Sequence, residues 1–468
     1  MSDLWTSEEI ATATGGTASA PFTVSGVAFD SREVTGGDLF VAMKGEATDG
    51  HRFLDKAFDQ GAAGAITSQP VDRPHVLVKD SAAALEALGR ASRKRMAGKV
   101  IGVTGSVGKT GTKEALFHAL DRATPGSVHR SVKSYNNHVG VPLSLSRMPR
   151  DCDFGVFEMG MNHAGELSAL TRLVRPHAAI VTAIAPAHIE FFGTEAAIAE
   201  AKGEIFEGLE PGGTAIIPYD SPHVATLYNK AERYAGRILT FGLGAGADVR
   251  ACEAVPAPGG GTLVTAALPG AEICFTISAP GEHWVSNALA ILAAVEAVGG
   301  DLGIAGLALA ELPGLPGRGE RRRVPAGGGE ALLIDESYNA NPLSMAATLK
   351  QLGREQAERR IAVLGGMREL GERSVELHEG LVGPLTAGRV DYAILVGDEM
   401  TPLARRLDGV VAFDHVADAE AAITLLQAQV RAGDAILIKG SNGIGLSRLV
   451  ATFQQTMSWP AATGKDTD

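Results

Sequence analysis

The chain has 468 residues, 45% of them hydrophobic and 21% charged, so it is long enough for about three globular domains and is not intrinsically disordered. Its formal net charge of −12 argues against a nucleic acid as the main partner, because binding a phosphate backbone needs a basic surface. Glycine is frequent at 58 residues and aromatic residues make up only 5%, which favours an α/β protein with many tight turns over a β-sandwich.

The cysteines and the N-terminus indicate a cytoplasmic protein. Cys152, Cys252 and Cys274 are far apart and lack the spacing of metal ligands or of a disulfide framework. The first residues, MSDLWTSEEI, are acidic and lack the basic-then-apolar order of a signal peptide. Apolar runs such as AAIVTAIAPAHI are interrupted by Pro and His well short of a membrane span, so we expect no membrane insertion.

The first predicted domain covers residues 1–98. It holds short alternating segments separated by turn residues, for instance SGVAFDSREVTGGDLFVAMKG, followed by an apolar helical stretch near DKAFDQGAAGA. A basic stretch at 89–99 then leads into an apolar strand at 100–104. We therefore expect a small α/β domain that ends near residue 98.

The second predicted domain covers residues 99–314, where strands alternate with helices. The runs FGVFEMG and AAIVTAIA show no polar alternation, which is typical of parallel strands covered on both faces. GGTAIIPYD, ILTFGL and AEICFTIS predict further strands, while TEAAIAEAKGEIFEGL and EHWVSNALAILAAVEAVGG predict helices. We expect a central parallel sheet of the kind found in P-loop ATPases.

The third predicted domain covers residues 315–468 and follows a linker. The stretch LPGLPGRGERRR (312–323) is rich in Pro and Gly, as linkers are. Beyond it, ALLIDES, RIAVLGGM, DYAILVGD and DAILIKG are strand-like runs that alternate with helices. This pattern predicts a Rossmann-like domain, so the fold class is α/β in three domains.

Residues 100–112, VIGVTGSVGKTGT, predict a phosphate-binding loop of unusual form. The common pattern G-x-x-x-x-G-K-[ST] requires a glycine at position 103, which is Val, and the turn opens at Gly105 instead. A Gly-rich turn between a strand and a helix directs backbone N–H groups at a phosphate. Lys109 adds a positive charge for the β- and γ-phosphates, and Thr110 offers a hydroxyl to Mg²⁺. A chance Gly-rich turn is the alternative, and nucleotide binding is favoured over it.

A GTPase is disfavoured by the rest of the sequence. Guanine recognition usually requires N-K-x-D after a strand, and the nearest match is NKAE at 229–232. That match carries Glu in place of Asp and lies in a segment that predicts a helix.

Three further residues are candidates for the site. Glu158 ends the run FGVFE, where a strand parallel to the loop strand would present a carboxylate to the metal that bridges ATP phosphates. His188 follows the next apolar run and would face the crevice beyond the strand ends, although a lone His is more often structural. Lys202 reads, from composition and spacing alone, as a solvated helix lysine.

Together these motifs resemble those of the Mur ligases, whose ATP loop reads T-G-[ST]-x-G-K-[ST] without the early glycine. The resemblance extends from about residue 22 to about residue 455 and is strongest to the branch of the family that adds a dipeptide. Its motifs are DSREVTGGDLFVAMKGEATDGHRF (30–53), SYNNHVGVPLSL (134–145), FEMGMNHAGEL (157–167), APAHIEFFGT (185–194), AKGEIFEGL (201–209), GEHWVSNALAILAA (281–294), LPGR (315–318), DESYNANPLSM (335–345) and LIKGS (437–441).

The resemblance implies an ATP- and Mg²⁺-dependent ligase of peptidoglycan precursor synthesis. Such an enzyme joins D-alanyl-D-alanine to UDP-N-acetylmuramoyl-tripeptide through an acyl phosphate and releases ADP and phosphate. We expect a monomer. The sequence leaves open whether the third residue of the tripeptide is diaminopimelate or lysine.

The resemblance also assigns site residues. The first domain would bind the UDP end of the precursor through Ser31, Arg32, Lys44 and Gly45. ATP would be bound by Gly105, Ser106, Val107, Gly108, Lys109, Thr110 and Gly111, with Asn287 at the adenine and Arg318 and Asp335 at the phosphates and ribose.

The remaining assignments concern metal ions, catalysis and the acceptor. The implied Mg²⁺ ligands are Thr110, Glu158, His188 and Lys202, the last as a carbamate. Asn136, Asn137 and His138 match the segment that lines the reaction site. Lys439 and Ser441 are our candidates for holding the terminal carboxylate of the dipeptide. The residues expected to be catalytic are Lys109, His188, Lys202 and Asn137.

One motif departs from the family pattern, and alternatives stay open. The dipeptide-adding branch usually has G-D-M-x-E-L-G, whereas residues 365–371 read GGMRELG, so Gly366 lacks a carboxylate while Glu369 keeps its place. Another Mur ligase step or folylpolyglutamate synthesis is an alternative, although the D-N-P-R typical of the diaminopimelate-adding ligase is absent from the sequence. A regulatory module that binds ATP without turnover is the alternative from a different class.

Overall fold

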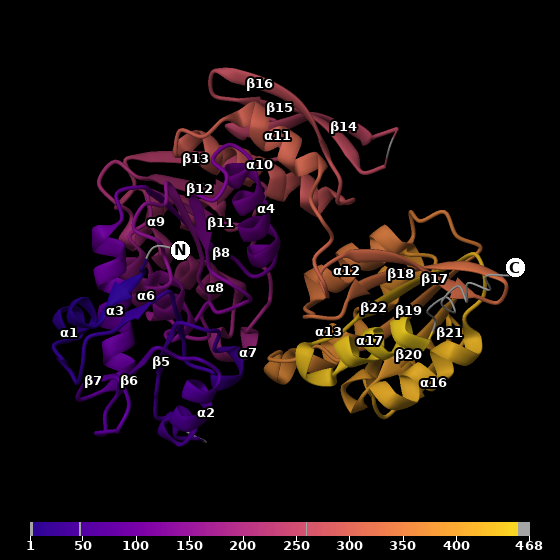
Figure 1. The fold of residues 1–468 in the computed structure, drawn as a ribbon. Coiled ribbons are helices and arrows are strands. Elements are labelled where there is room, and N and C mark those ends of the chain that lie inside the picture. Colours follow the sequence, from indigo (N-terminus) through magenta and orange to yellow (C-terminus); the bar gives the residue numbers. More distant parts are fainter. Residues whose placement is uncertain (1–2, 46–47, 259, 457–468) are drawn as a thin grey trace, which may run out of the picture.

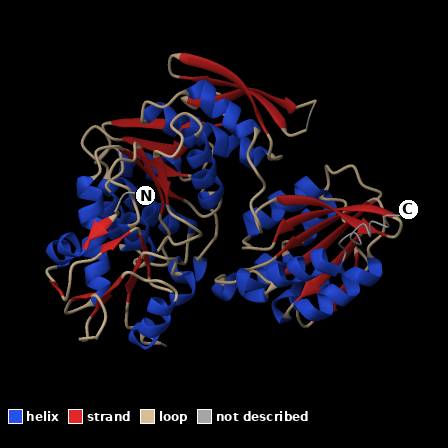
Figure 2. Cartoon of the chain, in the orientation of Figure 1, coloured by secondary structure: helices blue, strands red, loops and turns tan. Residues whose placement is uncertain are grey.

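The computed structural model describes residues 3–45, 48–258 and 260–456, which are arranged around three main sheets (Figures 1 and 2). The three sheets follow one another along the chain, as the three-domain α/β prediction requires. Within these residues, no helix has both the length and the apolar character needed to span a membrane.

The N-terminal part contains a five-stranded sheet in the order β2-β7-β6-β5-β4. Its strands are β2 (Thr17–Ala18), β4 (Gly26–Ala28), β5 (Asp38–Val41), β6 (Gly64–Thr67) and β7 (His75–Leu77), and a short pair is formed by β1 (Trp5–Thr6) and β3 (Thr23–Val24). The helices are α1 (Ser7–Thr14), α2 (Leu54–Asp59) and α3 (Ser81–Arg95). Asp80 begins α3 because its side chain accepts the N–H groups of Ala82 and Ala83.

The central sheet has nine strands in the order β16-β15-β14-β13-β12-β11-β8-β10-β9. They are β8 (Lys99–Thr104), β9 (Val128–Arg130), β10 (Phe154–Glu158), β11 (Ala178–Val181), β12 (Thr214–Pro218), β13 (Arg237–Gly242), β14 (Val249–Pro256), β15 (Thr262–Leu268) and β16 (Ala271–Ile277). The pairs β14–β15 and β15–β16 are antiparallel, so the prediction of a parallel sheet is wrong for this edge, which lies at the top of Figure 1. The other neighbours are parallel, and β14 and β15 were not predicted at all.

Helices cover both faces of this sheet, which explains the uninterrupted apolar runs of its strands. On one face lie α4 (Lys109–Asp121), α10 (Glu282–Ala297) and α11 (Leu302–Ala310). The other face is covered by α5 (Gly140–Ser146), α6 (Glu166–Val174), α8 (Glu195–Gly203), the 3₁₀ turn η3 (Glu204–Gly208) and α9 (Val224–Ala231). The NKAE segment lies at the end of α9, so its helix prediction is confirmed.

The C-terminal part contains a six-stranded sheet in the order β17-β18-β22-β19-β20-β21. Its strands are β17 (Glu320–Ala326), β18 (Gly329–Glu336), β19 (Arg359–Gly365), β20 (Tyr392–Val396), β21 (Ala412–Val416) and β22 (Asp434–Lys439). The helices are α12 (Pro342–Leu352), α13 (Ser374–Glu379), α14 (Val382–Ala387), α15 (Thr401–Leu407), α16 (Ala419–Gln429) and α17 (Leu446–Thr456). The linker predicted over 312–323 is shorter than expected, because residues 320–323 form the antiparallel edge strand β17.

The two larger sheets face each other with the carboxyl ends of their parallel strands. The phosphate-loop segment follows β8, and the carboxyl ends of β10, β18 and β22 carry residues that line one common cleft. In α/β proteins ligands bind at the carboxyl ends of parallel strands. The segment after α11 connects the two parts across this cleft (Figure 1).

Candidate active site

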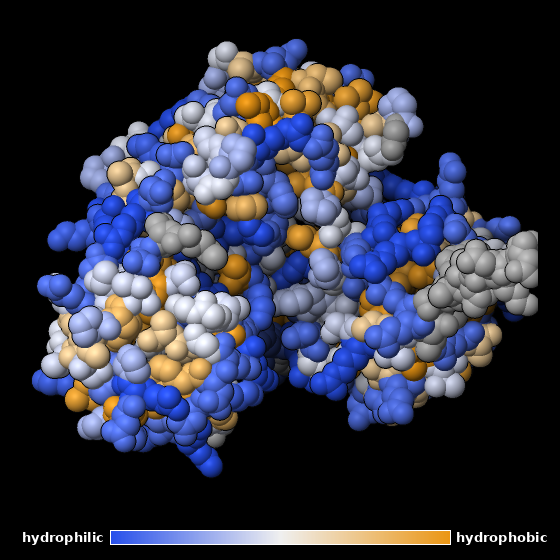
Figure 3. Space-filling view, in the orientation of Figure 1, coloured by the Kyte–Doolittle hydropathy of each residue, from blue (hydrophilic) through white to orange (hydrophobic). Residues whose placement is uncertain are grey.

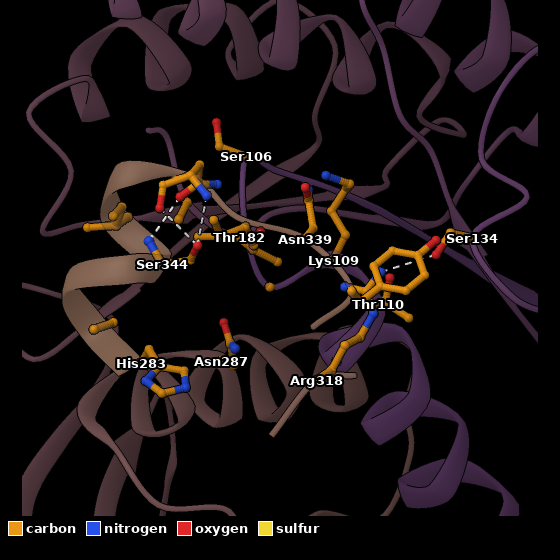
Figure 4. A pocket seen from close by; sticks show the side chains of 18 of the residues that line it. Ser106, Lys109, Thr110, Ser134, Thr182, His283, Asn287, Arg318, Asn339 and Ser344 are labelled. Carbon is orange, nitrogen blue, oxygen red and sulfur yellow. Dashed lines mark hydrogen bonds between the residues drawn. The ribbon is translucent and has the colours of Figure 1, made fainter. Parts of the chain in front are cut away.

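A cleft of about 480 Å³ lies between the central and C-terminal parts. Figure 3 shows the surface drawn inward where these parts meet, and Figure 4 shows the cleft from close by. One wall is formed by the phosphate loop, β10 and α10, and the opposite wall by residues 317–348 and Lys439. The cleft therefore brings together segments that lie more than 300 residues apart in the sequence.

Two glycines of the phosphate loop have positive φ angles, which other residues rarely adopt. Gly105 has φ +151° and Gly108 has φ +83°, and α4 begins at the next residue, Lys109. A Cβ atom on Gly105 would lie 1.9 Å from Oγ1 of Thr182, so only glycine fits at this position. Ser106 turns its hydroxyl away from solvent, donating to the carbonyl of Ala185 at 3.0 Å and accepting from the N–H of the same residue. The first turn of the loop is thus hydrogen-bonded to the segment that follows β11.

Lys109 lies against the loop itself. Its Nζ donates a 2.6 Å hydrogen bond to the carbonyl of Gly105. Burial lowers the pKa of Lys109, and the nearby Glu158 carboxylate partly opposes this change. The Lys109 amine lies at the loop, where a nucleotide phosphate would stabilise its charged form.

Glu158 is fully enclosed between two donors. It ends β10, which runs parallel to β8 with Glu158 opposite Val103. Its Oε2 accepts a 2.8 Å hydrogen bond from Thr110 and its Oε1 accepts one of 2.8 Å from Nδ2 of Asn136. Both carboxylate oxygens are thus oriented beside the phosphate loop, as the position at the strand end predicted.

Lys202 is buried, contrary to the solvated lysine that composition alone suggested. It lies on α8, is 1% exposed and lines the cleft. Within the described residues, no hydrogen bond or ion pair involves its ammonium group. Burial places the pKa of Lys202 well below its usual value, and the charge of Lys109 adds to this shift. A neutral buried amine is nucleophilic enough to react with carbon dioxide, so the residue fits the carbamate that the resemblance implies.

His188 joins the two walls. It follows β11 in the left-handed conformation, with φ +60°, and begins the short helix α7 (Ile189–Phe192). Its Nδ1 lies 2.5 Å from Oε2 of Glu369, although the geometry is not that of a linear hydrogen bond. The imidazole lowers the pKa of the Glu369 carboxyl.

The opposite wall carries both positively and negatively charged side chains. The guanidinium of Arg318 stacks 3.9 Å from the ring of Tyr338 and donates to Oγ of Ser134 at 3.2 Å. At the ends of two neighbouring strands, Nζ of Lys439 lies 3.5 Å from Oε2 of Glu336 and donates to the carbonyl of Asn339 at 3.0 Å. Burial raises the pKa of Glu336 and lowers that of Lys439, and each partner opposes the shift of the other.

One side of the cleft is formed by α10. Asn287 and His283 come from this helix in Figure 4, and a Cβ atom on Gly108 would lie 3.0 Å from Oδ1 of Asn287. A Cβ atom on Gly111 would lie 3.1 Å from the Trp284 ring. The helix therefore packs directly against the phosphate loop, and the role of Asn287 at the adenine stays a prediction.

The donors present suit Mg²⁺ held together with phosphates. Across the described ranges, no cluster of three or more His, Cys, Asp and Glu side chains has the arrangement of a metal site. Thr110 and Glu158 nevertheless place a hydroxyl and a carboxylate side by side next to the loop. Mg²⁺ prefers oxygen ligands and is usually bound by one or two carboxylates together with substrate phosphates and water. The residues therefore fit this ion.

Several residues predicted for the site do not line the cleft. Asn137 points its Oδ1 at the start of α5, where it accepts the N–H groups of Val139 and Gly140. Asp335 accepts the N–H groups of Gly317 and Ser337 and so shapes the turn that carries Arg318. These two residues support cleft-lining neighbours.

The other predicted residues outside the cleft lie in two places. Ser441 accepts the N–H of Arg368 through its hydroxyl, so it holds the loop after β19. Ser31 is buried, and Arg32 is exposed and paired with Asp30. These two, with Lys44 and Gly45, belong to the N-terminal part. The UDP-binding role proposed for them stays a prediction.

The structure adds residues that the sequence reasoning did not select. Lys113 of α4 is fully buried and donates to the carbonyls of Ser131 and Lys133, which supports the segment that carries Asn136. Thr182 donates to the carbonyl of Val107 at 2.5 Å. Glu336 was part of the quoted motif DESYNANPLSM, so a carboxylate at a strand end was the signal for it. No pattern in a single sequence distinguishes Lys113 from an exposed helix lysine.

A phosphate loop that faces the strand ends of a second α/β unit defines a nucleotide-binding enzyme with a cleft between domains. Three family models match this chain: "Mur ligase family, catalytic domain" over residues 23–94, "Mur ligase middle domain" over 103–295, and "Mur ligase, glutamate ligase domain" over 317–442. The chain belongs to the Mur ligase family.

Several relatives that match most of the chain are UDP-N-acetylmuramoyl-tripeptide–D-alanyl-D-alanine ligases. The UDP-N-acetylmuramoyl-tripeptide–D-alanyl-D-alanine ligase of Escherichia coli is 34% identical over 440 residues, which are 93% of this chain and 95% of the relative. A crystal structure of MurF from Acinetobacter baumannii has a TM-score of 0.82 at 30% identity and covers 96% of this chain and 99% of that one. MurF from Thermotoga maritima in complex with ADP has a TM-score of 0.77 at 29% identity, covering 93% and 98%.

Proposed function

We propose that this chain is the ATP-dependent ligase that joins D-alanyl-D-alanine to UDP-N-acetylmuramoyl-tripeptide in peptidoglycan precursor synthesis. The observation that supports this most strongly is its similarity, over 93% of its length, to a relative that bears this name. The cleft agrees with the proposal, since it sets a phosphate loop opposite a second wall with its own buried cation, Lys439. ATP use is also supported by the ADP bound to the related Thermotoga enzyme.

The reaction requires the cleft to activate a carboxylate. The carboxylate of the nucleotide-linked tripeptide attacks the γ-phosphorus of ATP, so a C–O–P acyl phosphate forms as the bond to ADP breaks. Lys109 offsets the negative charge that gathers on the transferred phosphoryl group, and Thr110 and Glu158 would hold Mg²⁺ beside it. The ion supplies electrostatic stabilisation of the phosphate oxygens when it is bound.

The second half of the reaction forms the amide bond. The amino group of D-alanyl-D-alanine attacks the activated carbonyl, and inorganic phosphate leaves. Lys439 has three N–H donors, of which Glu336 and the Asn339 carbonyl engage two, so one is left for the terminal carboxylate of the acceptor. Water must be kept away because an exposed acyl phosphate hydrolyses, and the C-terminal wall provides that cover.

The remaining assignments complete the proposal. We propose that residues 1–98 bind the UDP end, 99–314 bind ATP, and 315–468 bind the acceptor and close the cleft. His188 and carbamylated Lys202 would complete the Mg²⁺ ligands. We also propose that the enzyme is monomeric and cytoplasmic, and its three widely separated cysteines agree with a reducing compartment.

A mass-resolved assay tests this function. The protein is incubated with UDP-N-acetylmuramoyl-tripeptide, ATP, Mg²⁺ and D-alanyl-D-alanine, and the nucleotide-linked pentapeptide is sought together with ADP. Two forms of the tripeptide, with diaminopimelate and with lysine, also resolve the third residue. A regulatory module would bind ATP without releasing ADP when all substrates are present, and that result would reject the proposal.

A further inference from the structure

The segment after β19 contacts the central part at His188. In this segment, residues 366–371, Glu369 places its Oε2 2.5 Å from Nδ1 of His188. The carbonyl of Glu369 also accepts the N–H of Glu190 at 3.3 Å. A Cβ atom on Gly371 would lie 3.2 Å from Cα of Glu190, so the two backbones are in close contact. The contact is therefore made by a whole segment and not by one flexible side chain.

Residues 366–371 are held in place by hydrogen bonds to other residues of the C-terminal domain. Buried His378 accepts the N–H of Met367 through Nε2 at 2.9 Å. Buried Ser441 accepts the N–H of Arg368 at 3.0 Å, and its own N–H donates to the carbonyl of Gly366 at 3.1 Å. These bonds fix the backbone on the N-terminal side of Glu369. The Glu369 carboxylate is therefore presented to His188 by a backbone that these hydrogen bonds hold in place.

Gly366 explains why Glu369 is the carboxylate that this segment offers. A Cβ atom at position 366 would lie 2.8 Å from Cβ of Glu399, which is closer than side-chain carbons approach. An aspartate, as the family usually has there, would require this neighbour to move. Within residues 366–371, Glu369 is the acidic side chain, and it is directed at His188.

A carboxylate on one imidazole nitrogen fixes what the other nitrogen does. A histidine that binds a metal usually donates its second ring N–H to a carboxylate, which sets the tautomer and the ring orientation. Nδ1 of His188 lies at ion-pair distance from Glu369 without hydrogen-bond geometry, no described residue forms a hydrogen bond with Nε2, and the residue lines the cleft. The ring is thus arranged to offer Nε2 to a ligand in the cleft.

We propose that Glu369 is a positioning residue for His188, so that the C-terminal domain orients a metal ligand of the central domain. The proposal rests on the ligase function proposed above. If Glu369 has this role, the metal site depends on the position of the C-terminal domain against the central domain, because the carboxylate and the imidazole belong to different domains. Closure of the cleft and assembly of the metal site are then one event.

Metal binding tests this role without turnover. Free Mn²⁺ is followed by electron paramagnetic resonance as it titrates the full-length protein with a saturating ATP analogue that has a methylene group between the β- and γ-phosphorus atoms. The variants are Glu369→Gln, His188→Asn and the double variant. Glu372→Gln is the matched control, since Glu372 is an exposed acid directly after the segment and no ion pair joins it to a described residue. Thermal melting of each variant accompanies the titrations.

We expect Glu369→Gln to weaken Mn²⁺ binding about tenfold or more, with melting close to wild type and with Glu372→Gln unchanged. In the His188→Asn background, Glu369→Gln should have no further effect, because its only route to the metal has been removed. The Glu369 side chain is 43% exposed, so folding should tolerate the change. Glu369→Ala is titrated with Mn²⁺ as a second variant that lacks the carboxylate.

Two results would overturn the positioning role. One is Mn²⁺ binding by Glu369→Gln and Glu369→Ala that equals wild type. The other is an equal loss with and without His188, which would mean that Glu369 acts by another route. Failure of the wild-type protein to bind Mn²⁺ with the analogue would instead contradict the proposed function, so the two failures are distinguishable.

Discussion

The hydroxyl of Thr110 donates a 2.8 Å hydrogen bond to Oε2 of Glu158, which joins the first turn of α4 to the carboxyl end of β10. The other carboxylate oxygen accepts from Asn136, so the phosphate loop, its neighbouring strand and the segment 131–137 meet at one carboxylate. This meeting point lies beside Lys109, whose ammonium is hydrogen-bonded to the loop. The charge of Lys109 and the oxygens of Thr110 and Glu158 are therefore arranged for a phosphate and its metal ion.

Lys109→Ala should abolish ligase turnover. The ammonium supplies a fixed positive charge to the β- and γ-phosphates, and the loss of one such electrostatic contact typically costs about a hundredfold or more in rate. The measurement is ADP release with all substrates present, and Lys99→Ala, at the exposed start of β8, is the control. An activity above about a tenth of wild type would show that the loop does not act on the transferred phosphate.

Lys202→Ala should be nearly inactive and should regain activity with added short carboxylic acids. A carbamate presents oxygens to Mg²⁺, whereas an ammonium repels the ion, and a free carboxylate can replace the carbamate in the space left by the side chain. Burial favours the neutral amine that forms the carbamate, since it lowers the pKa of Lys202. Activity is measured with and without acetate.

Lys230→Ala is the matched control for Lys202, because Lys230 lies on the adjacent helix and pairs with Glu200 at the surface. It should keep wild-type activity and show no response to acetate. A fully active Lys202→Ala variant would return this lysine to a purely structural role in the core.

Lys439→Met should both weaken dipeptide binding and destabilise the fold. Its KM should rise for D-alanyl-D-alanine far more than for ATP, because the proposed partner of the terminal carboxylate is lost. The change also leaves Glu336, whose side chain is 19% exposed, without its cation, and breaking a fully buried pair typically costs about 3–5 kcal/mol, so we expect a smaller loss here. Removing both charges, in Lys439→Met with Glu336→Gln, should restore most of the urea midpoint. No recovery in the double variant would mean that the pair does not control stability.

The instability of Lys439→Met should depend on pH in a definite direction. Burial raises the pKa of Glu336, and the Lys439 cation opposes the rise, so its removal raises this pKa further. A carboxyl whose pKa is raised by folding favours the folded state at low pH, and this contribution is lost as the pH rises through the folded-state pKa. The urea midpoint of the variant should thus approach wild type near about pH 5 and fall furthest below it near about pH 8. A deficit that does not change with pH would contradict this.

The sequence predicted those parts of the fold whose signals are local. Apolar runs located most parallel strands of both larger sheets, although β9 and β21 were not predicted, and the glycines at 105 and 108 located the phosphate loop. At the antiparallel edge of the central sheet β16 was predicted, but β14 was missed because it is exposed along most of its length and lacks a continuous apolar run. Residues 320–323 were assigned to a linker because three consecutive arginines hide an edge strand.

The site was predictable where a side chain follows directly from a strand end, and not where burial decides. Glu158 and Lys439 end their strands and line the cleft. The burial of Lys202 depends on helices that pack around α8 from distant parts of the chain, which spacing within one helix does not reveal. Asn137 differs from Asn136 only in the direction of its side chain, and that direction is set by the start of α5.

The choice of acceptor tests the central claim most directly. ADP release is measured with the nucleotide-linked tripeptide saturating and with D-alanyl-D-alanine, D-alanine, L-lysine or diaminopimelate as the amine. The terminal carboxylate of a dipeptide lies one residue farther from the reacting amine than that of an amino acid, so a cation placed for one is misplaced for the other. A buried donor left unpaired costs about 1–3 kcal/mol, which is roughly ten- to a hundredfold in rate. We expect at least this preference for D-alanyl-D-alanine. Faster turnover with any single amino acid would contradict the proposed function.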